Sequence, residues 1–261
     1  MSIKVGLAQI DVSFGQTDEN FERVEKFVAQ AAKQQVDVVV FPEMWNTGYA
    51  LTELDQLADR DGAHTKELLS KLAKQYHVNI VGGSVSTNRN GHFYNTSYIF
   101  DSEGQLVSQY DKVHLFGLMH EEQFITAGAA KNQFTLAGVL SAGVICYDIR
   151  FPEWLRTNAL GGAKIIYVSA EWPESRIKQW ETLLAARAIE NQAFVVAVNR
   201  VGNDPDNHFS GHSQVIDPLG NVVLDAGEDE ALVTTEFDFD QIDQVRGSIP
   251  VFDDRRPELY E

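Results

Sequence analysis

Short apolar segments alternate with amphipathic segments along this chain, and their order constrains the fold. Residues 36–41 and 139–145 are almost free of charge, as expected of strands that are buried on both faces of a sheet. Apolar residues recur at helical spacing after the first strand, 3–10, and again in 65–76 and 180–192. The predicted order β-α-β-α-β-β-β occurs twice. We therefore expect an α/β fold with two similar halves, in which right-handed crossovers place the helices outside the sheets.

The remaining elements follow the same pattern, and no linker separates them. Asp18 or Asn20 is positioned to cap the first helix, and Pro152 fits the first turn of a later one. Further strands are expected at 78–85, 93–100, 105–110, 164–169, 194–199, 212–217, 221–224 and 231–237, with a helical turn at 241–245 and an extended tail at 247–261. The chain is therefore predicted to be a single domain, 1–261.

Composition limits the partners and the chemistry of the chain. Its formal net charge of −17 disfavours nucleic acid and anionic membranes as partners. A single cysteine excludes an internal disulfide and a cysteine-rich metal site, and it is consistent with a reducing compartment. The N-terminal residues predict a strand and not a signal peptide, and no apolar stretch approaches the length of a membrane span. We therefore expect a cytoplasmic protein that contains no metal.

The only cysteine, Cys146, directly follows the apolar segment 139–145. A side chain at the end of a rigid strand, before a turn and a helix, is well placed to act as a nucleophile, because nearby backbone N–H groups can face developing negative charge. A helix N-terminus would also lower the pKa of the thiol. The alternative is a buried structural cysteine, since free cysteines are among the most buried residues.

Two charged residues occupy similar positions after other predicted strands. Glu43 follows the apolar segment 36–41, and Lys112 follows a strand of a predicted hairpin. Because strand ends converge at one edge of an α/β sheet, we expect both side chains to lie near Cys146. A buried carboxylate can act as the base for a thiol, and a lysine ammonium can stabilise an oxyanion together with the backbone N–H of Tyr147. Taken alone, Glu43 also fits a loop acid or a cap, and Lys112 an ordinary surface lysine.

Three segments resemble the signature segments of the nitrilase superfamily of carbon–nitrogen hydrolases. They are Phe41-Pro42-Glu43, Tyr110-Asp111-Lys112-Val113-His114-Leu115 and Cys146-Tyr147-Asp148-Ile149-Arg150-Phe151-Pro152-Glu153. The resemblance extends over nearly the whole chain, and residues 42–45, 146–150 and 184–191 are most similar to the ω-amidase branch. It implies a nitrilase-like α-β-β-α sandwich of two mixed sheets with helices outside, which forms a homodimer.

The resemblance also implies catalytic roles. Cys146 would be the nucleophile, Glu43 the general base and Lys112 the stabiliser of the oxyanion. The family has a second glutamate in the loop after the lysine; Glu121 matches it best, although the adjacent Glu122 leaves the assignment open. The implied reaction is hydrolysis of the amide C–N bond of a small dicarboxylic acid monoamide, such as 2-oxoglutaramate or 2-oxosuccinamate, through a cysteine thioester. It consumes water, releases ammonia and needs no metal or organic cofactor.

A substrate with a free carboxylate needs a cation near the nucleophile. Arg150, Arg176 and Lys178 are the candidates, and the sequence does not choose among them. Arginine offers a carboxylate a fixed two-pronged fork that lysine cannot reproduce, but Arg150 could instead pair with Asp148 or a nearby glutamate. The aromatic residues that could line the pocket, each of which also suits the core, are Trp45, Tyr49, Phe116, Tyr147 and Trp172.

Other interpretations stay open at this point. His114 and His120 flank the lysine loop and are the plausible members of a cysteine–histidine pair. Arg187 and Glu190, three residues apart on a predicted helix, fit a structural ion pair. The functional alternatives are a related amidase that acts on an N-carbamoyl compound or a nitrile, transfer to an amine in place of hydrolysis, and a non-catalytic binding scaffold. The intact set of catalytic candidates argues against the scaffold.

Overall fold

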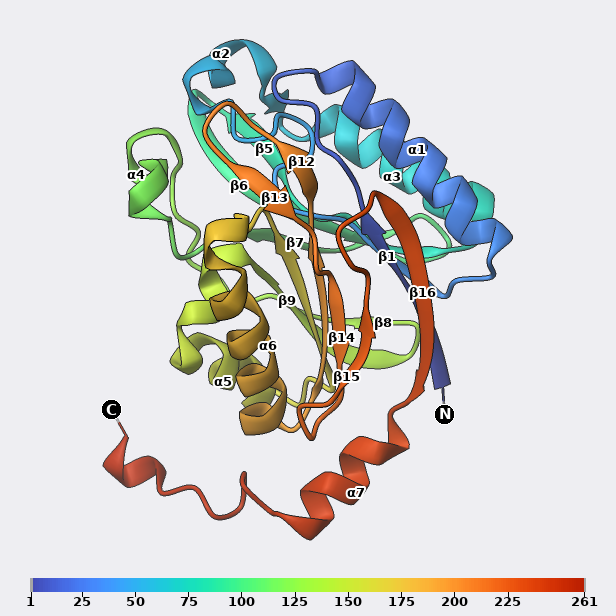
Figure 1. Ribbon diagram of the computed structural model, residues 1–261, viewed down its shortest axis with the longest axis vertical. Coiled ribbons are helices and arrows are strands. Elements are labelled where there is room, and N and C mark those ends of the chain that lie inside the picture. Colours follow the sequence, from blue (N-terminus) through green and yellow to red (C-terminus); the bar gives the residue numbers. More distant parts are fainter. Residues whose placement is uncertain (1, 261) are drawn as a thin grey trace.

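The computed structural model describes residues 2–260, and its strands form two large mixed sheets (Figure 1). The strands of the first sheet are β1 Ser2–Gln9, β2 Val38–Val40, β3 Asp59–Arg60, β4 Asn79–Val81, β5 Val85–Arg89, β6 His92–Phe100, β7 Leu106–Asp111 and β16 Ala231–Asp238. They follow the order β16-β1-β2-β4-β6-β5-β3, with β7 paired to β6. The central pairs β1–β2 and β2–β4 are parallel, whereas β16 and β6 join them antiparallel.

The second sheet comes from the second half of the chain. Its strands are β8 Gln133–Leu136, β9 Val139–Ile145, β10 Ile165–Ala170, β11 Phe194–Asn199, β14 Gln214–Ile216 and β15 Val222–Asp225. They follow the order β15-β14-β11-β10-β9-β8, and the central strands β9, β10 and β11 are parallel. A separate antiparallel pair is formed by β12 Val201–Asn203 and β13 His208–Ser210.

Helices cover the outer face of each sheet (Figure 1). The α-helices are α1 Thr17–Lys33, α2 Leu54–Leu57, α3 Ala63–Tyr76, α4 Glu121–Phe124, α5 Pro152–Leu160, α6 Ile177–Asn191 and α7 Asp240–Ser248. Short 3₁₀ helices are η1 Leu51–Glu53, η2 Gly117–Met119, η3 Cys146–Arg150, η4 Glu174–Arg176 and η5 Pro257–Leu259. Helices α1 and α3 pack on the first sheet and α5 and α6 on the second, so the predicted repetition of two similar halves is confirmed.

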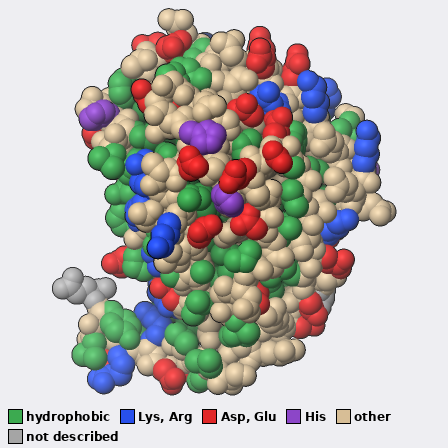
Figure 2. Space-filling view, viewed as in Figure 1, with side chains coloured by type: hydrophobic (Ala, Val, Ile, Leu, Met, Phe, Trp, Pro, Cys, Tyr) green, Lys and Arg blue, Asp and Glu red, His purple; other side chains and the backbone are tan. Residues whose placement is uncertain are grey.

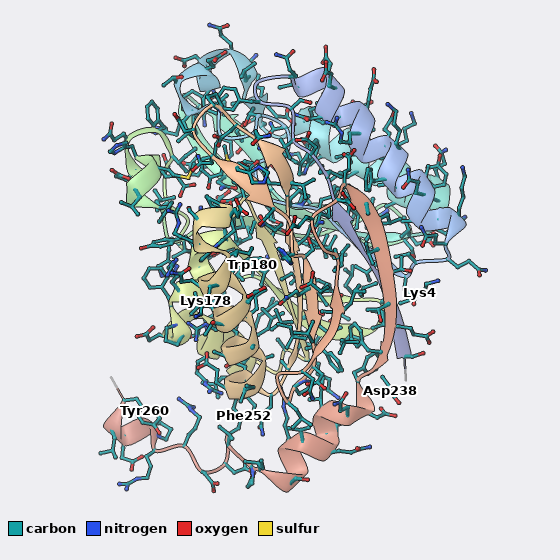
Figure 3. All side chains as sticks on the ribbon, viewed as in Figure 1. Lys4, Lys178, Trp180, Asp238, Phe252 and Tyr260 are labelled. Carbon is teal, nitrogen blue, oxygen red and sulfur yellow. The ribbon has the colours of Figure 1, made fainter. Side chains whose placement is uncertain are left out.

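The central strands are apolar on both faces because both faces are buried. On β10, Ile165 and Tyr167 pack between the two sheets, whereas Ile166 and Val168 pack against α5 and α6. Full burial of one such aliphatic side chain contributes roughly 1.5–3 kcal/mol. The helices, in contrast, are buried on one side: Trp180 on α6 is inside the protein, and Lys178 on the same helix is exposed (Figure 3). The layer order is therefore α-β-β-α, as expected.

Several expectations about individual elements were wrong. The predicted strand 78–85 is two strands, β4 and β5, because the chain turns between them. The apolar pattern also gave no sign of β8 or of the β12–β13 pair. Neither Asp18 nor Asn20 caps α1; the Asn20 side chain instead bonds to the backbone N–H and carbonyl of Ser13, each at 2.8 Å. The final helical turn is longer than expected, since α7 continues to Ser248.

The surface reflects the acidic composition. Figure 2 shows one face of the molecule, on which acidic side chains are prominent and basic side chains are scattered. This agrees with the formal net charge of −17. Within residues 2–260, no helix combines the length and the apolar character that crossing a membrane requires.

Candidate active site

Three strand ends bring the predicted catalytic residues together. Glu43 lies three residues past the end of β2, Lys112 directly follows β7, and Cys146 directly follows β9. Because β9 belongs to the second sheet and the other two strands to the first, the site lies at the junction of the two sheets. Lys112 Nζ is 2.7 Å from Glu43 Oε1, and both side chains are fully buried.

The loop that carries Glu43 is fixed by the turn between β4 and β5. Gly83 in this turn has a φ of +63°, and a Cβ there would lie 2.0 Å from the carbonyl oxygen of Pro42, so only glycine fits. The Ser84 N–H donates to the same carbonyl at 3.0 Å, and the Ser84 hydroxyl accepts the N–H of Met44 at 2.9 Å. These contacts hold the backbone on both sides of Glu43.

Both oxygens of the Glu43 carboxylate accept hydrogen bonds. Oε1 accepts from Asn95 Nδ2 at 2.9 Å and from Lys112 Nζ at 2.7 Å, and the Tyr49 hydroxyl lies 2.7 Å from the same oxygen. Oε2 accepts the backbone N–H of Glu171 at 3.0 Å. The carboxylate therefore has a fixed orientation, which a general base requires.

Lys112 is buried between two carboxylates. Its Nζ lies 2.9 Å from both oxygens of Glu121, in addition to its contact with Glu43, and 3.1 Å from the Tyr49 hydroxyl. Burial alone would lower the pKa of Lys112, but the charges of Glu121 and Glu43 raise it above its usual value. The side chain therefore remains a cation although it is shielded from solvent.

The geometry favours Glu121 over Glu122 as the second glutamate. Glu121 is the first residue of α4 and is buried, whereas Glu122 is exposed. Besides its contacts with Lys112, Glu121 Oε2 accepts the backbone N–H of Phe116 at 2.5 Å. The same carboxylate therefore orients the lysine and fixes the start of the loop that contains η2.

Cys146 has a strained backbone conformation, with a φ of +42° at the start of η3. A positive φ is uncommon for a residue with a side chain, and it is typical of a nucleophile that is held at a sharp turn after a strand. The residue is 8% exposed, and its Sγ lies 3.9 Å from the carbonyl oxygen of Glu171.

The expected lowering of the thiol pKa by a helix N-terminus was wrong. Burial, and then the Glu43 carboxylate, raise the pKa of the Cys146 thiol well above its usual value, although Lys112 opposes them. The physical reason is that Cys146 begins only the short 3₁₀ helix η3, while α5 begins at Pro152, so burial of the thiol dominates over any effect of a helix N-terminus. A neutral thiol needs a base before it can attack, and Glu43 is the neighbouring group that can act as one.

Asp148 joins the cysteine turn to β7 and to the segment that follows Lys112. Its Oδ2 accepts the Tyr110 hydroxyl at 2.8 Å and the Ile145 N–H at 2.9 Å. Its Oδ1 accepts the His114 N–H at 3.1 Å and lies 2.7 Å from His114 Nδ1. A single buried carboxylate thereby fixes the nucleophile turn relative to the lysine strand.

We expect Asp148→Ala to destabilise the protein, because the buried Tyr110 hydroxyl and Ile145 N–H and the half-buried backbone N–H of His114 would lose their acceptor. An unpaired buried polar group costs about 1–3 kcal/mol, so the free energy of unfolding should fall by about 3 kcal/mol or more. Urea denaturation followed by circular dichroism measures this loss. Asp253→Ala, at an exposed position in the C-terminal segment, is the matched control and should change the value by less than about 0.5 kcal/mol. Equal losses in the two variants would contradict the bracing role of Asp148.

The predicted ion pair between Arg187 and Glu190 is confirmed. On α6, Nη1 of the buried Arg187 lies 2.8 Å from Oε1 of the partly exposed Glu190. Arg187 Nε also donates to the carbonyl of Ile149 at 2.7 Å. The pair therefore supports η3 from the side of α6 and is structural, as expected.

The cysteine–histidine alternative is contradicted by the geometry. The His114 ring is bound to Asp148 and stacks on Phe151, with ring centroids 3.8 Å apart. His120 is exposed and precedes α4. In the described part of the chain, no histidine lines the pocket around Cys146.

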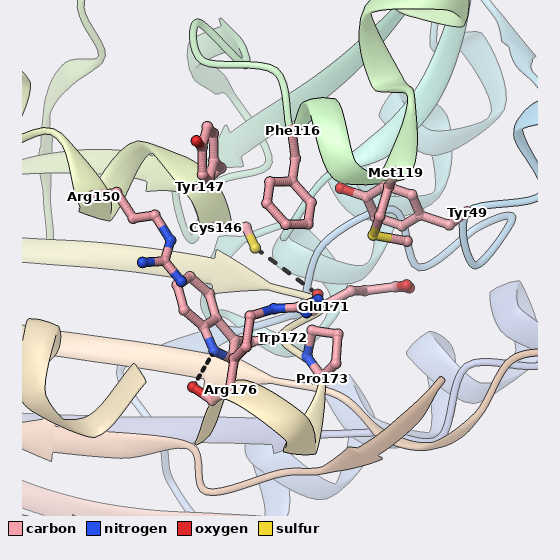
Figure 4. A pocket seen from close by; sticks show the side chains of 10 residues that line it. All are labelled: Tyr49, Phe116, Met119, Cys146, Tyr147, Arg150, Glu171, Trp172, Pro173 and Arg176. Carbon is pink, nitrogen blue, oxygen red and sulfur yellow. Dashed lines mark hydrogen bonds between the residues drawn. The ribbon is translucent and has the colours of Figure 1, made fainter. Parts of the chain in front are cut away.

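A small pocket opens beside Cys146 (Figure 4). Its lining residues are Tyr49, Phe116, Met119, Cys146, Tyr147, Arg150, Glu171, Trp172, Pro173 and Arg176. The structure thus brings Tyr49, Phe116, Tyr147 and Trp172 to the pocket, together with two of the three candidate cations. The walls are largely aromatic, and the polar groups come from a few residues, as in many small-molecule sites.

Two candidates from the sequence lie elsewhere. Trp45 is part of the core: its Nε1–H donates to the Gly82 carbonyl at 2.8 Å, and its ring meets Phe21 edge-on. Lys178 lies on the exposed side of α6 (Figure 3). It lines a surface groove together with Arg150. Aromatic character and sequence proximity did not distinguish these positions from true lining residues.

The two arginines of the pocket lie over aromatic rings. The Arg150 guanidinium carbon is 4.7 Å from the centre of the Trp172 ring, and that of Arg176 is 5.5 Å from the centre of the Phe116 ring. Neither forms an ion pair with another residue in 2–260. The suggested pairing of Arg150 with Asp148 is wrong, because Asp148 binds other donors. An anion that enters the pocket therefore meets two available guanidinium groups.

The possible metal ligands that the described residues bring together lie outside this pocket. Among the described residues, Glu181, His212 and Asp225 place possible ligand atoms within 4.8 Å of one another. None of the three lines the pocket, and exposed acidic groups of this kind are common without a metal.

Comparison with known proteins identifies the family. The family model for carbon–nitrogen hydrolases matches residues 4–247. The chain belongs to the carbon–nitrogen hydrolase family. The "2-oxoglutaramate amidase" of Bacillus subtilis (strain 168) is 48% identical over 260 residues, and the match covers 100% of both chains. The "Omega-amidase NIT2" of Homo sapiens is 30% identical, over 99% of this chain and 97% of that protein.

A solved structure extends the similarity of this carbon–nitrogen hydrolase to the fold. The crystal structure of Saccharomyces cerevisiae Nit3, a member of branch 10 of the nitrilase superfamily, superposes with a TM-score of 0.91 at 30% identity. The superposition covers 98% of this chain and 97% of that chain. The predicted membership of the nitrilase superfamily and the predicted sandwich are therefore confirmed.

Sequence reasoning missed several residues of the hydrolase site. Asn95 donates to Glu43 from within β6, and the sequence gave no signal for it. Met119, the last residue of η2, and Pro173, which precedes η4, also line the pocket. Glu171 could have been found, because it directly follows β10 just as Cys146 follows β9. Because strand ends converge at one edge of an α/β sheet, the residue after β10 is expected near the site for the same reason as the residues after β2, β7 and β9.

Proposed function

We propose that this carbon–nitrogen hydrolase is an ω-amidase that hydrolyses small dicarboxylic acid monoamides of the 2-oxoglutaramate or 2-oxosuccinamate type. The observation that carries the proposal is the pair of available arginines in the pocket of the buried thiol. The names of two relatives, a 2-oxoglutaramate amidase and an omega-amidase, support the same substrate class. Water is the second reactant, and the reaction needs no cofactor.

In the first half of the proposed reaction, Cys146 forms a thioester. Glu43 takes the proton of the thiol as Sγ attacks the amide carbon. Lys112 and the backbone N–H of Tyr147 stabilise the negative charge that develops on the carbonyl oxygen. Glu43 then gives the proton to the leaving nitrogen, the C–N bond breaks and ammonia departs.

In the second half, water releases the acid. Glu43, again a carboxylate, takes a proton from a water molecule, and the resulting hydroxide attacks the thioester carbon. When the tetrahedral intermediate collapses, the C–S bond breaks and the sulfur regains a proton through Glu43. Glu121 holds Lys112 in place throughout, since both of its oxygens contact the ammonium. Each proton that Glu43 accepts is returned, so the enzyme ends as it began.

The free carboxylate of the substrate is proposed to bind Arg150 or Arg176. Both guanidinium groups lie in the pocket that contains Cys146, whereas Lys178 does not. A bidentate contact would place the amide carbon over the thiol, and positioning of this kind can supply several kcal/mol of rate acceleration. The aromatic rings under both arginines limit their motion and favour a fixed geometry.

We expect 2-oxoglutaramate and succinamate to exceed glutamine, an N-carbamoyl amine, a simple nitrile and an uncharged amide in kcat/KM by at least about tenfold. This lead corresponds to about 1.4 kcal/mol of transition-state stabilisation. Ammonia release, which each of these substrates gives on hydrolysis, measures it. Preference for the nitrile or the carbamoyl compound would overturn the substrate assignment.

Substitution of the arginines tests which group binds the carboxylate. Arg150→Gln or Arg176→Gln should lower kcat/KM for 2-oxoglutaramate by about tenfold or more, because a charged hydrogen-bond partner is lost, while propionamide is less affected. Lys178→Gln is the matched control, since this cation lies outside the pocket, and it should leave the ratio of the two substrates unchanged. If both arginine variants lost equal factors in kcat/KM on the charged and the uncharged amide, the proposal that an arginine binds the substrate carboxylate would be contradicted.

We further propose that residues 1–261 form one hydrolase domain that acts as a cytoplasmic homodimer. The family model, which extends over residues 4–247, supports one domain. The lone cysteine is in keeping with a reducing compartment and supports the cytoplasmic assignment. A monomer mass of 29.2 kDa predicts a particle of twice that mass in light scattering, and a monomeric particle would contradict the dimer.

A further inference from the structure

Glu171 contacts both reacting groups through its main chain. Its N–H donates to Glu43 Oε2 at 3.0 Å, and its carbonyl oxygen lies 3.9 Å from Cys146 Sγ (Figure 4). This residue directly follows β10, so its backbone position is set by the end of a central strand. The main chain of Glu171 therefore orients the base, and the proposed reaction gives no task to its side chain.

The side chain of Glu171 is nevertheless a buried acid. The residue is 2% exposed, and neither carboxylate oxygen has a hydrogen-bond partner among the described residues. The side chain extends away from the thiol (Figure 4). Its ion-pair partner is Arg200, whose Nη1 lies 3.6 Å from Oε1 and also has no hydrogen bond among residues 2–260. Replacement of such a pair by apolar residues is often neutral or stabilising, so stability alone does not explain it.

Arg200 is held in place by the protein backbone. Its Nε donates to the Val201 carbonyl at 3.0 Å, and its Nη2 donates to the Val12 carbonyl at 2.6 Å. The guanidinium carbon lies 4.5 Å from the centre of the Phe209 ring. The cation is therefore fixed, and Glu171 is the member of the pair that can change its charge.

Three charged groups act on the Glu171 carboxyl: Arg200, Glu43 and Asp204. Burial raises the pKa of Glu171 to about 8; Arg200, from the end of β11, opposes the rise, and Glu43 and Asp204 add to it. Asp11 lies on the far side of Arg200, 3.4 Å from Nη2. The Glu171 carboxyl therefore passes from neutral to charged within the range of pH in which such an enzyme is assayed.

We propose that Glu171 is a positioning residue that tunes the general base: its main chain aligns Glu43 with Cys146, and its Arg200-bound carboxyl places a second negative charge behind Glu43 when it ionises. This inference rests on the proposed amidase mechanism. When the thiol gives its proton to Glu43, the Glu43 carboxylate beside Glu171 becomes neutral. Negative charge develops instead on the substrate carbonyl oxygen that Lys112 faces. An ionised Glu171 therefore favours the transfer.

The test is the dependence of kcat/KM on pH for the full-length protein and for Glu171→Gln, which keeps the shape of the side chain but cannot ionise. We expect kcat/KM of the wild type to rise by about threefold or more between pH 7 and pH 9, and this rise to be absent in Glu171→Gln. Arg200→Lys, which holds the carboxylate less closely, should move the rise to higher pH. Glu174→Gln, an exposed acid three residues along the same segment, is the matched control and should keep the wild-type profile.

A second readout separates this inference from the proposed function. The rate at which iodoacetamide labels the only cysteine depends on the same base and needs no amide substrate. A labelling rate that rises with pH in the wild type and more weakly in Glu171→Gln would support the inference even if no tested amide were hydrolysed. Identical profiles of labelling and of turnover in the wild type and Glu171→Gln would overturn it, even if ω-amidase activity were established.

Discussion

Cys146→Ala should fold normally and lose turnover by roughly 10⁴-fold or more, the scale seen when a nucleophile is removed. The physical reason is that no other group in the described pocket can form the thioester. Cys146→Ser should be nearly as inactive, because a hydroxyl is a much weaker nucleophile than a thiol at neutral pH. The measurement is kcat for ammonia release from 2-oxoglutaramate, with circular dichroism and the melting temperature as the check on folding.

Chemical labelling provides the complementary experiment on the wild type. Since the chain has one cysteine, one equivalent of iodoacetamide should label Cys146 and abolish activity in the same proportion. The residue is 8% exposed, so the reagent must enter through the pocket, and 2-oxoglutaramate should slow the labelling. Full activity in completely labelled protein would remove Cys146 from the role of nucleophile.

Much of the fold followed from the sequence because burial determines the pattern of the central strands. Strand β9 and strand β11 occur at the residues predicted, since each is a short apolar segment buried on both faces. The errors lie where one apolar pattern serves two elements. Residues 78–85 are uncharged and mostly apolar, but their middle must leave the sheet to hold the Glu43 loop. Hydrophobicity does not report such a turn, and only the contact with Pro42 explains it.

The catalytic candidates were predictable for a different reason. Glu43, Lys112 and Cys146 each follow a strand, so topology alone places them at one edge. What the sequence did not provide was their electrostatic state. The helix rule predicted a lowered thiol pKa, whereas burial and the Glu43 carboxylate raise it. Solvation depends on every group packed around the sulfur, and these groups come from both sheets.

The substrate-binding residues show the same limit. The sequence offered three candidate cations and no means of choosing among them. The structure separates Arg176 from Lys178 by the direction of the chain at the start of α6. Arg176, at the end of η4, lies in the pocket, whereas Lys178, two residues later, points to solvent. A helix turns about 100° per residue, so a small change in where it begins decides which side chain faces the nucleophile.

The second large effect is expected from Glu43→Gln, which should lower kcat by at least about a hundredfold, the scale of a lost general base. Glutamine can still accept hydrogen bonds from Asn95 and Lys112 through its amide oxygen, so the fold should be retained. It cannot take the proton of a thiol whose pKa is raised by burial, and the attack on the amide therefore stalls. Single-turnover kinetics should show the loss in thioester formation, before any water enters the reaction.

Lys112→Ala should lower kcat by a similar factor, because an oxyanion stabiliser is removed, but it should also destabilise the protein. Without the ammonium, Glu43 and Glu121 are two buried carboxylates with no cation between them, and breaking a buried pair costs about 3–5 kcal/mol. The two variants therefore differ in a way that a general loss of folding does not produce: Glu43→Gln loses activity alone, and Lys112→Ala loses both. If His114→Ala or His120→Ala were far more damaging to kcat than Glu43→Gln, the base would be a histidine, and the assignment of Glu43 would fail.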